Sequence, residues 1–218
     1  INKVLIYRTF FVFLLFDFTN HTFMIIGIDY GAKLAGTTVI ARMYDHNKVD
    51  FFASAKNQDA DQFIVDFIKV NENVWLAYFD APLSLPKIYS QDVPNGDYFY
   101  READKATGAM SPMFLGGLTA RAMKLSVEIT KLGVKVVETY PSKLADVLKL
   151  KEKNYKKDRH QIAALCEELK EISGFMFDNE KVETWHHFDS LLCLYSAKRH
   201  EMQSAMVFGD AKEGTITV

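Results

Sequence analysis

The chain has 218 residues, of which 49% are hydrophobic and 25% are charged, as in ordinary folded proteins and unlike disordered or fibrous ones. This length fills one core well and is short for two full domains. The formal net charge is −2, so no overall positive field attracts nucleic acid, and any such binding has to rest on a local patch.

The N-terminal residues 1–23 do not predict a membrane span. Their apolar run at 10–16 is interrupted by Asp17, whereas a spanning helix needs about 20 apolar residues, and no small-residue cleavage site of a signal peptide follows. We interpret 1–23 as a non-native or disordered extension, with Met24 as the natural start of a domain at 24–218. The two cysteines lack metal-ligand spacing and suit buried thiols, so we expect a cytoplasmic protein without a membrane partner.

The first half of the domain predicts three strands, a helix and a fourth strand. The three strands are rich in β-branched and aromatic residues, and short turns join them, which favours an antiparallel meander; they are expected at 24–31, 36–45 and 48–56. Residues 59–70 place apolar side chains at helical spacing. The next strand, 73–83, contains Asp80-Ala81-Pro82, where we expect it to stop.

The second half begins with a stretch, 85–112, that holds prolines, glycines and mixed charge without a clean period, so we interpret it as a long insertion or lid. A helix at 113–133 and a buried strand at 134–141 follow. Helices are then expected at 142–150, 157–173 and 183–202, and a strand pair at 205–209 and 215–218 around a Gly209-Asp210 turn. The order β-β-β-α-β-α-β-α predicts an α/β fold with a mixed sheet, helices on both faces and a long insertion after the fourth strand.

Four acidic residues occupy equivalent places in this pattern. Asp29, Asp80 and Glu138 fall at or near the ends of predicted strands, where sites form in open α/β sheets, and Asp189 lies on the last long helix. Each acid alone is more often a turn or a cap. As an ordered set they suit Mg²⁺ or Mn²⁺, which offsets their mutual repulsion, so we predict all four as catalytic metal ligands. His186 shares a helix face with Asp189, and we predict it as a proton shuttle.

The motifs around these acids resemble the ribonuclease H-like superfamily. IGIDYGAKLAGTTVIA is similar to its opening motif, and together with FDAPLSLP, an R-E-A-D segment, VVETYPSKL and HHFDSLLCLYSA it resembles the domain of unknown function 429 family of predicted nucleases. The resemblance covers Ile25 to Arg199 and implies a ribonuclease H-like fold and a nuclease whose metal is bound by Asp29 and Asp189. The final His-x-x-Asp also resembles that of Holliday-junction resolvases, in which the histidine assists the metal or the leaving group. Asp80 departs from the superfamily, which often has a Glu as its second acid.

Three further side chains are candidates for substrate binding. Lys33 follows the first strand in a glycine turn, where it either meets a phosphate or is solvated. Arg101 either clamps a phosphate with two parallel hydrogen bonds or forms an exposed ion pair with Asp104. Tyr140, like Tyr30, flanks an acid and either stacks on a base or packs in the core.

The leading hypothesis is a metal-dependent nuclease that acts on DNA, RNA or a nucleotide, and the sequence does not choose among these substrates or give an oligomeric state. The most basic stretch, 149–159, is either a solvated connection or a phosphate-contacting patch. One alternative is a nucleotide-binding or phosphotransfer module of the actin-like ATPase type, which shares the Asp-x-Gly pattern at Asp29 but needs a duplicated core. Another is a catalytically inactive ribonuclease H-like binding protein.

Overall fold

A computed structural model describes residues 23–45, 47–90 and 96–218 of the chain. These residues form an α/β fold with a five-stranded mixed sheet in the order β3-β2-β1-β4-β5 and a separate two-stranded sheet, β6-β7. The predicted N-terminal extension up to residue 22, His46 of the predicted turn, and residues 91–95 of the predicted insertion lie outside the described residues.

The strands of the large sheet are β1 (Met24–Asp29), β2 (Val39–Tyr44), β3 (Lys48–Ala53), β4 (Val74–Asp80) and β5 (Lys135–Glu138), and those of the small sheet are β6 (Val207–Asp210) and β7 (Gly214–Thr217). The α-helices are α1 (Ala60–Val70), α2 (Glu102–Thr107), α3 (Pro112–Leu115), α4 (Gly117–Lys131), α5 (Pro141–Val147), α6 (Ile162–Ser173) and α7 (Trp185–Glu201). Four 3₁₀ turns connect them, η1 (Lys87–Tyr89), η2 (Leu150–Lys153), η3 (Arg159–Gln161) and η4 (Asn179–Lys181). Within the described residues, no helix has the length and apolar character to cross a bilayer.

The large sheet joins an antiparallel meander to a parallel half. Strands β1, β2 and β3 pair antiparallel in succession, as predicted, and β1, β4 and β5 pair parallel. A parallel pair needs a crossover connection; α1 belongs to the one that leads from β1 to β4, and α4 to the one that leads from β4 to β5. As a result β1, β4 and β5 end at the same edge of the sheet.

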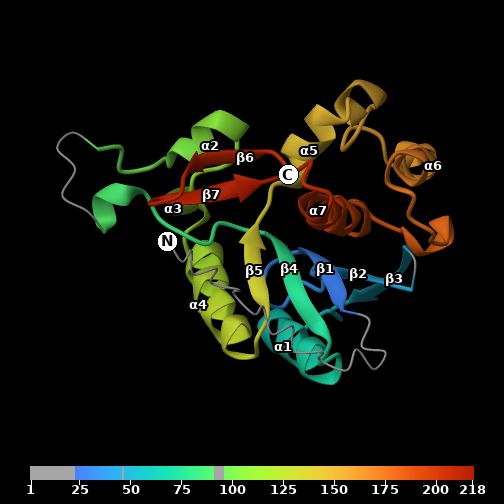
Figure 1. The fold of residues 1–218 in the computed structure, drawn as a ribbon, viewed down its shortest axis with the longest axis horizontal. Coiled ribbons are helices and arrows are strands. Elements are labelled where there is room, and N and C mark those ends of the chain that lie inside the picture. Colours follow the sequence, from blue (N-terminus) through green and yellow to red (C-terminus); the bar gives the residue numbers. More distant parts are fainter. Residues whose placement is uncertain (1–22, 46, 91–95) are drawn as a thin grey trace, which may run out of the picture.

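Helices cover both faces of the large sheet (Figure 1), as the sequence predicts. Helices α1 and α4 lie on one face and bury Ile64 and Leu125 against Ile26 of β1. Helix α7 crosses the other face and buries Leu191 against Ile25, with α5 and α6 outside it. Side chains alternate between the faces along a strand, and with both faces covered all six residues of β1 are buried.

Three predicted elements differ from the structure. The helix predicted at 113–133 is two helices, because Gly116 adopts a positive φ of 49° between α3 and α4, a conformation open to glycine. The insertion is not structureless, since it holds α2, which ends at Gly108 with φ 74°. The turn between β6 and β7 spans residues 211–213, so the predicted Gly209-Asp210 turn is wrong.

The sheet and its helical cover approach each other closely at Gly27 in the middle of β1. A Cβ on this residue would lie 2.1 Å from the backbone nitrogen of Leu194 and 2.4 Å from the backbone oxygen of Ser190, both in α7. One residue on, the Cys193 thiol donates a hydrogen bond to the Ile28 carbonyl at 3.5 Å. The strand and the helix therefore pack backbone against backbone, which only glycine allows.

We predict that Gly27→Ala destabilises the protein by about 1–3 kcal/mol, the typical cost of overpacking a core, because α7 has to move away from β1. Urea unfolding followed by circular dichroism measures the loss. Gly117→Ala is the matched control, because a Cβ there meets no atom within 4 Å. Equal stability of the two variants would contradict the close packing of β1 on α7.

Candidate metal centre

Three of the four predicted acids meet at the edge where the parallel strands end. Asp29 and Asp80 are the last residues of β1 and β4 and are register partners, so their side chains leave the sheet on the same face. Asp189, in the second turn of α7, reaches them from that face. One carboxylate oxygen from each residue lies within 4.8 Å of the other two. We call these three residues the acidic triad.

Glu138, the predicted fourth ligand, lies outside the acidic triad. It ends β5, but its register partner is Phe79 and not Asp80. Because neighbouring residues of a strand point to opposite faces, the side chains of Glu138 and Asp80 diverge. Both Glu138 oxygens accept hydrogen bonds from the Arg101 guanidinium, at 2.6 and 2.7 Å. The carboxylate of Glu138 is therefore held in a separate ion pair.

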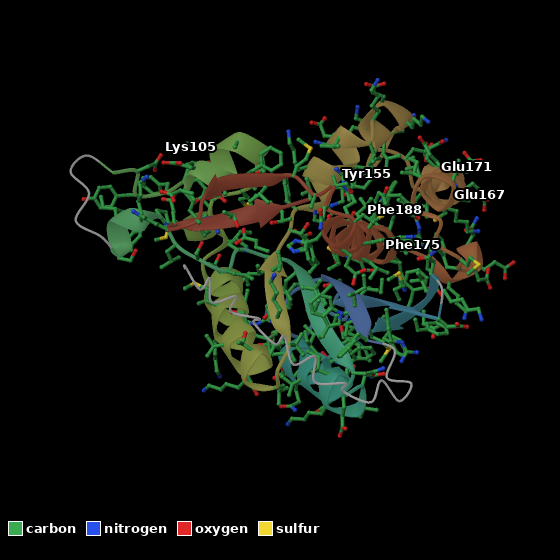
Figure 2. All side chains as sticks on the ribbon, viewed as in Figure 1. Lys105, Tyr155, Glu167, Glu171, Phe175 and Phe188 are labelled. Atoms are coloured by element: carbon green, nitrogen blue, oxygen red, sulfur yellow. The ribbon has the colours of Figure 1, made fainter. Side chains whose placement is uncertain are left out.

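A lysine and a histidine border the acidic triad. His186 Nδ1 lies 2.8 Å from Asp29 Oδ2, with the imidazole half exposed. Lys156 Nζ lies 2.5 Å from Asp189 Oδ2, and Tyr155 donates its hydroxyl to the other oxygen of Asp189 at 2.5 Å. Figure 2 shows Tyr155 over helix α7 beside Phe188, and their ring centroids are 6.0 Å apart.

The triad is short of positive charge. Burial, reinforced by the charges of Asp29 and Asp189, raises the pKa of Asp80 well above its usual range. Burial also raises the pKa of Asp29, against the hydrogen bond from His186, and raises that of Asp189 to about 6. The hydrogen bond to Asp29 in turn raises the pKa of His186. When all three acids are ionised, Lys156 and a protonated His186 offset two of the three charges, so a further cation is favoured.

The donor set of the triad fits a hard divalent cation. Mg²⁺ and Mn²⁺ prefer carboxylate oxygens as ligands, and the triad offers three such oxygens within 4.8 Å of one another. Among the described residues, none donates a hydrogen bond to the Asp80 carboxylate. A site whose ligands are all carboxylate oxygens favours Mg²⁺ or Mn²⁺ over soft metals that prefer thiolate ligands. Asp29, Asp80 and Asp189 are therefore the residues that could hold the ion.

Both predicted roles of Arg101, a phosphate clamp and an exposed ion pair with Asp104, are wrong. Its side chain is fully buried, so the ion pair with Asp104 is not an exposed one. All five N–H groups are occupied within the protein: Nε and Nη2 donate to Asp104, Nη1 and Nη2 to Glu138, and Nη1 to Ser84 at 2.8 Å. No donor is left for a phosphate. Arg101 instead ties the insertion to the ends of β4 and β5.

The two other predicted substrate contacts lie in different places. Lys33 pairs with Asp59, the N-cap of α1, at 3.0 Å on the surface, and is not among the charges that act on the triad. Tyr140, the residue before α5, is half-buried and lines a cavity next to Asp80. Tyr30 lines the same cavity.

Tyr155 and Lys156 are the site residues that the sequence analysis did not single out. They belong to the basic stretch at 149–159, for which a phosphate-contacting role is one of the two predicted alternatives. Lys156 has a positive φ of 60°, so the chain turns sharply beside Asp189. Lysines are frequent in this stretch, and nothing in their spacing distinguishes the one that meets Asp189.

We predict that Mg²⁺ raises the melting temperature of the protein. A cation at about 100 times its Kd contributes about 2.7 kcal/mol, which is roughly 5–10 °C for a chain of this size. Asp80→Asn abolishes this response, and in chelator it is more stable than wild type because it relieves the repulsion inside the triad. Differential scanning fluorimetry measures both effects. Asp66→Asn, on the exposed surface of α1, is the matched control and responds to Mg²⁺ as wild type does.

The pH dependence of the same response follows from the raised pKa values. In chelator, native Asp189 keeps a proton up to about pH 6, whereas in the unfolded chain it loses the proton near pH 3.8, so its contribution to stability falls as pH rises through this window. His186, whose pKa is also raised, stabilises the fold below its unfolded pKa and loses this effect at higher pH. The Mg²⁺ response has the opposite trend and fades below about pH 6. A response that grows on acidification would contradict binding at the triad.

We predict that Arg101→Met destabilises the protein by about 3–5 kcal/mol, because it leaves Asp104 and Glu138 buried without a cation. Urea unfolding measures the loss. Lys105→Met removes the exposed pair with Asp97 and is the control, with little effect on stability. A small effect of Arg101→Met would mean that the carboxylates are not held by the guanidinium.

No family model, curated protein or solved structure matches this chain. The assignment of the site therefore rests on its geometry, which is a buried edge where Asp29, Asp80 and Asp189 meet beside one lysine and one histidine.

Proposed function

We propose that the protein is a metal-dependent nuclease with a ribonuclease H-like fold, which hydrolyses phosphodiester bonds with Mg²⁺ or Mn²⁺ at the acidic triad. The observation that carries the proposal is the convergence of three carboxylates within 4.8 Å at the end of two parallel strands. The order of a three-stranded meander followed by parallel strands agrees with the family resemblance in the sequence. Asp29 and Asp189, which that resemblance implies as metal ligands, both belong to the triad.

The three acids of the triad would hold the metal ion that takes part in hydrolysis. A bound Mg²⁺ or Mn²⁺ supplies Lewis-acid polarisation of a phosphoryl oxygen and activation of water. Asp29, Asp80 and Asp189 would hold the ion. Because these residues are buried, water screens their attraction for the ion less than it would at the surface. Hydrolysis then forms one P–O bond to the water oxygen and breaks one to the leaving oxygen, which takes up a proton.

His186 and Lys156 are suited to the proton and the phosphate. His186 uses Nδ1 for Asp29, which leaves Nε2 of a half-exposed ring to exchange a proton with water or the leaving oxygen. The Lys156 side chain is 46% exposed, so its ammonium can contact a phosphate oxygen while it still neutralises Asp189.

The decisive experiment incubates the protein with labelled single-stranded, duplex and branched DNA and with RNA in Mn²⁺ and Mg²⁺. We expect metal-dependent cleavage of at least one substrate. Asp189→Asn should lower the rate by at least about 100-fold, because the loss of several kcal/mol of charge stabilisation corresponds to such a factor.

Asp66→Asn is the control for this assay and keeps the wild-type rate. Cleavage that survives Asp189→Asn would point to a contaminating nuclease. ATP turnover without cleavage of any nucleic acid would contradict the proposal in favour of a phosphotransfer module.

A further inference from the structure

A cavity of about 270 Å³ opens beside the acidic triad. Asp80 belongs to both, since it is a member of the triad and also lines the cavity. The remaining wall comes from the ends of β1, β4 and β5, from α3, α4 and β7, and from the insertion that carries α2. Met110 of the insertion and Leu115 of α3 line the cavity. The insertion thus supplies one wall of a compartment next to the triad.

The wall is mainly apolar and includes two aromatic rings. Tyr30 and Tyr140 line the cavity together with Leu118 and Pro82. Tyr30 is fixed, because its hydroxyl donates to Asp61 at 2.5 Å and its ring packs 4.7 Å from that of Phe79. Apolar walls with a few hydroxyl groups are typical of sites for flat ring systems.

The ionisable side chains that line the cavity disfavour an anionic group inside it. Arg101 is the one cation among the described residues that line it, and all of its N–H groups are already used by the protein. Asp80, Asp104 and Glu138 leave the wall negative overall. A phosphate is therefore repelled from the cavity, whereas an uncharged ring is accepted, and a phosphate has its counter-charges outside, at Lys156 and at an ion on the triad.

We propose that this cavity receives the base of the nucleotide whose phosphate lies at the acidic triad, with the base turned out of the stack of its neighbours. The inference rests on the proposed nuclease function and names its substrate as single-stranded or locally unpaired nucleic acid. Turning a base out of an intact duplex costs a few kcal/mol, and an unpaired base avoids most of that cost. The formal net charge of −2 agrees with such local gripping, because the protein as a whole does not attract a long, highly charged duplex.

The test compares nucleoside 5′-monophosphates with ribose 5-phosphate, which lacks the base, by isothermal titration calorimetry in Mg²⁺. We expect at least one monophosphate to bind about tenfold more tightly than ribose 5-phosphate, as for one stacked base. Ala109→Trp fills the cavity from the insertion and should remove this advantage. Ala106→Trp makes the same change on the exposed surface of α2 and should keep it.

A second variant, Tyr140→Leu, removes one ring and keeps an apolar wall, so it serves if Ala109→Trp fails to fold. It should weaken binding of the monophosphates and leave ribose 5-phosphate unchanged. Equal binding of the two ligand types to wild type, or unchanged binding by both cavity variants, overturns the inference.

Different experimental results would contradict this inference and the proposed function. If the cavity is not a base site, Mg²⁺ still raises the melting temperature and Asp189→Asn still abolishes cleavage. If the nuclease proposal is wrong, no metal-dependent cleavage that Asp189→Asn removes is observed, whatever binds in the cavity. Cleavage of an oligonucleotide with an abasic residue at the scissile position, at the rate of the intact strand, would overturn the base site alone.

Discussion

The geometry of the acidic edge depends on the backbone contact between β1 and α7 at Gly27. The strand presses against the helix near Ser190 and Leu194 because no Cβ separates them. Asp29 lies two residues beyond Gly27, and Asp189 precedes Ser190 in the helix, so this one contact sets the separation of their carboxylates. The parallel pairing of β1 with β4 then adds Asp80 as the register partner of Asp29.

Two sets of buried acids differ in the cations that neutralise them. Asp104 and Glu138 share one guanidinium whose five N–H groups are all used, which suits a fixed link between the insertion and the sheet. The acidic triad has a half-exposed lysine and a half-exposed histidine beside it, and both can exchange with solvent or substrate. Loss of one partner from a complete buried ion pair is strongly destabilising, whereas an incomplete cluster at the mouth of a cavity is suited to bind an ion.

The sequence predicted the strands of the sheet and the long helices, and it missed where short elements begin and end. Enrichment in β-branched and aromatic residues identifies the strands of the meander, and apolar side chains at helical spacing identify α1. Helix α2 has six residues, too few for a period to be visible. The break at Gly116 depends on how α3 and α4 pack, and a single glycine inside a helical pattern does not indicate it.

The sequence by itself determined that three acids lie at or near the ends of strands and that a fourth lies on the last long helix, because hydrophobic patterns indicate which residues form which element. Only the tertiary structure decided which of these acids meet. A shift of one residue in the pairing of β4 with β5 turns Glu138 away from Asp80, and such a register follows from long-range packing that no local pattern contains. The same packing buried Arg101 against Glu138 and brought Lys156, a residue of an irregular turn, to Asp189.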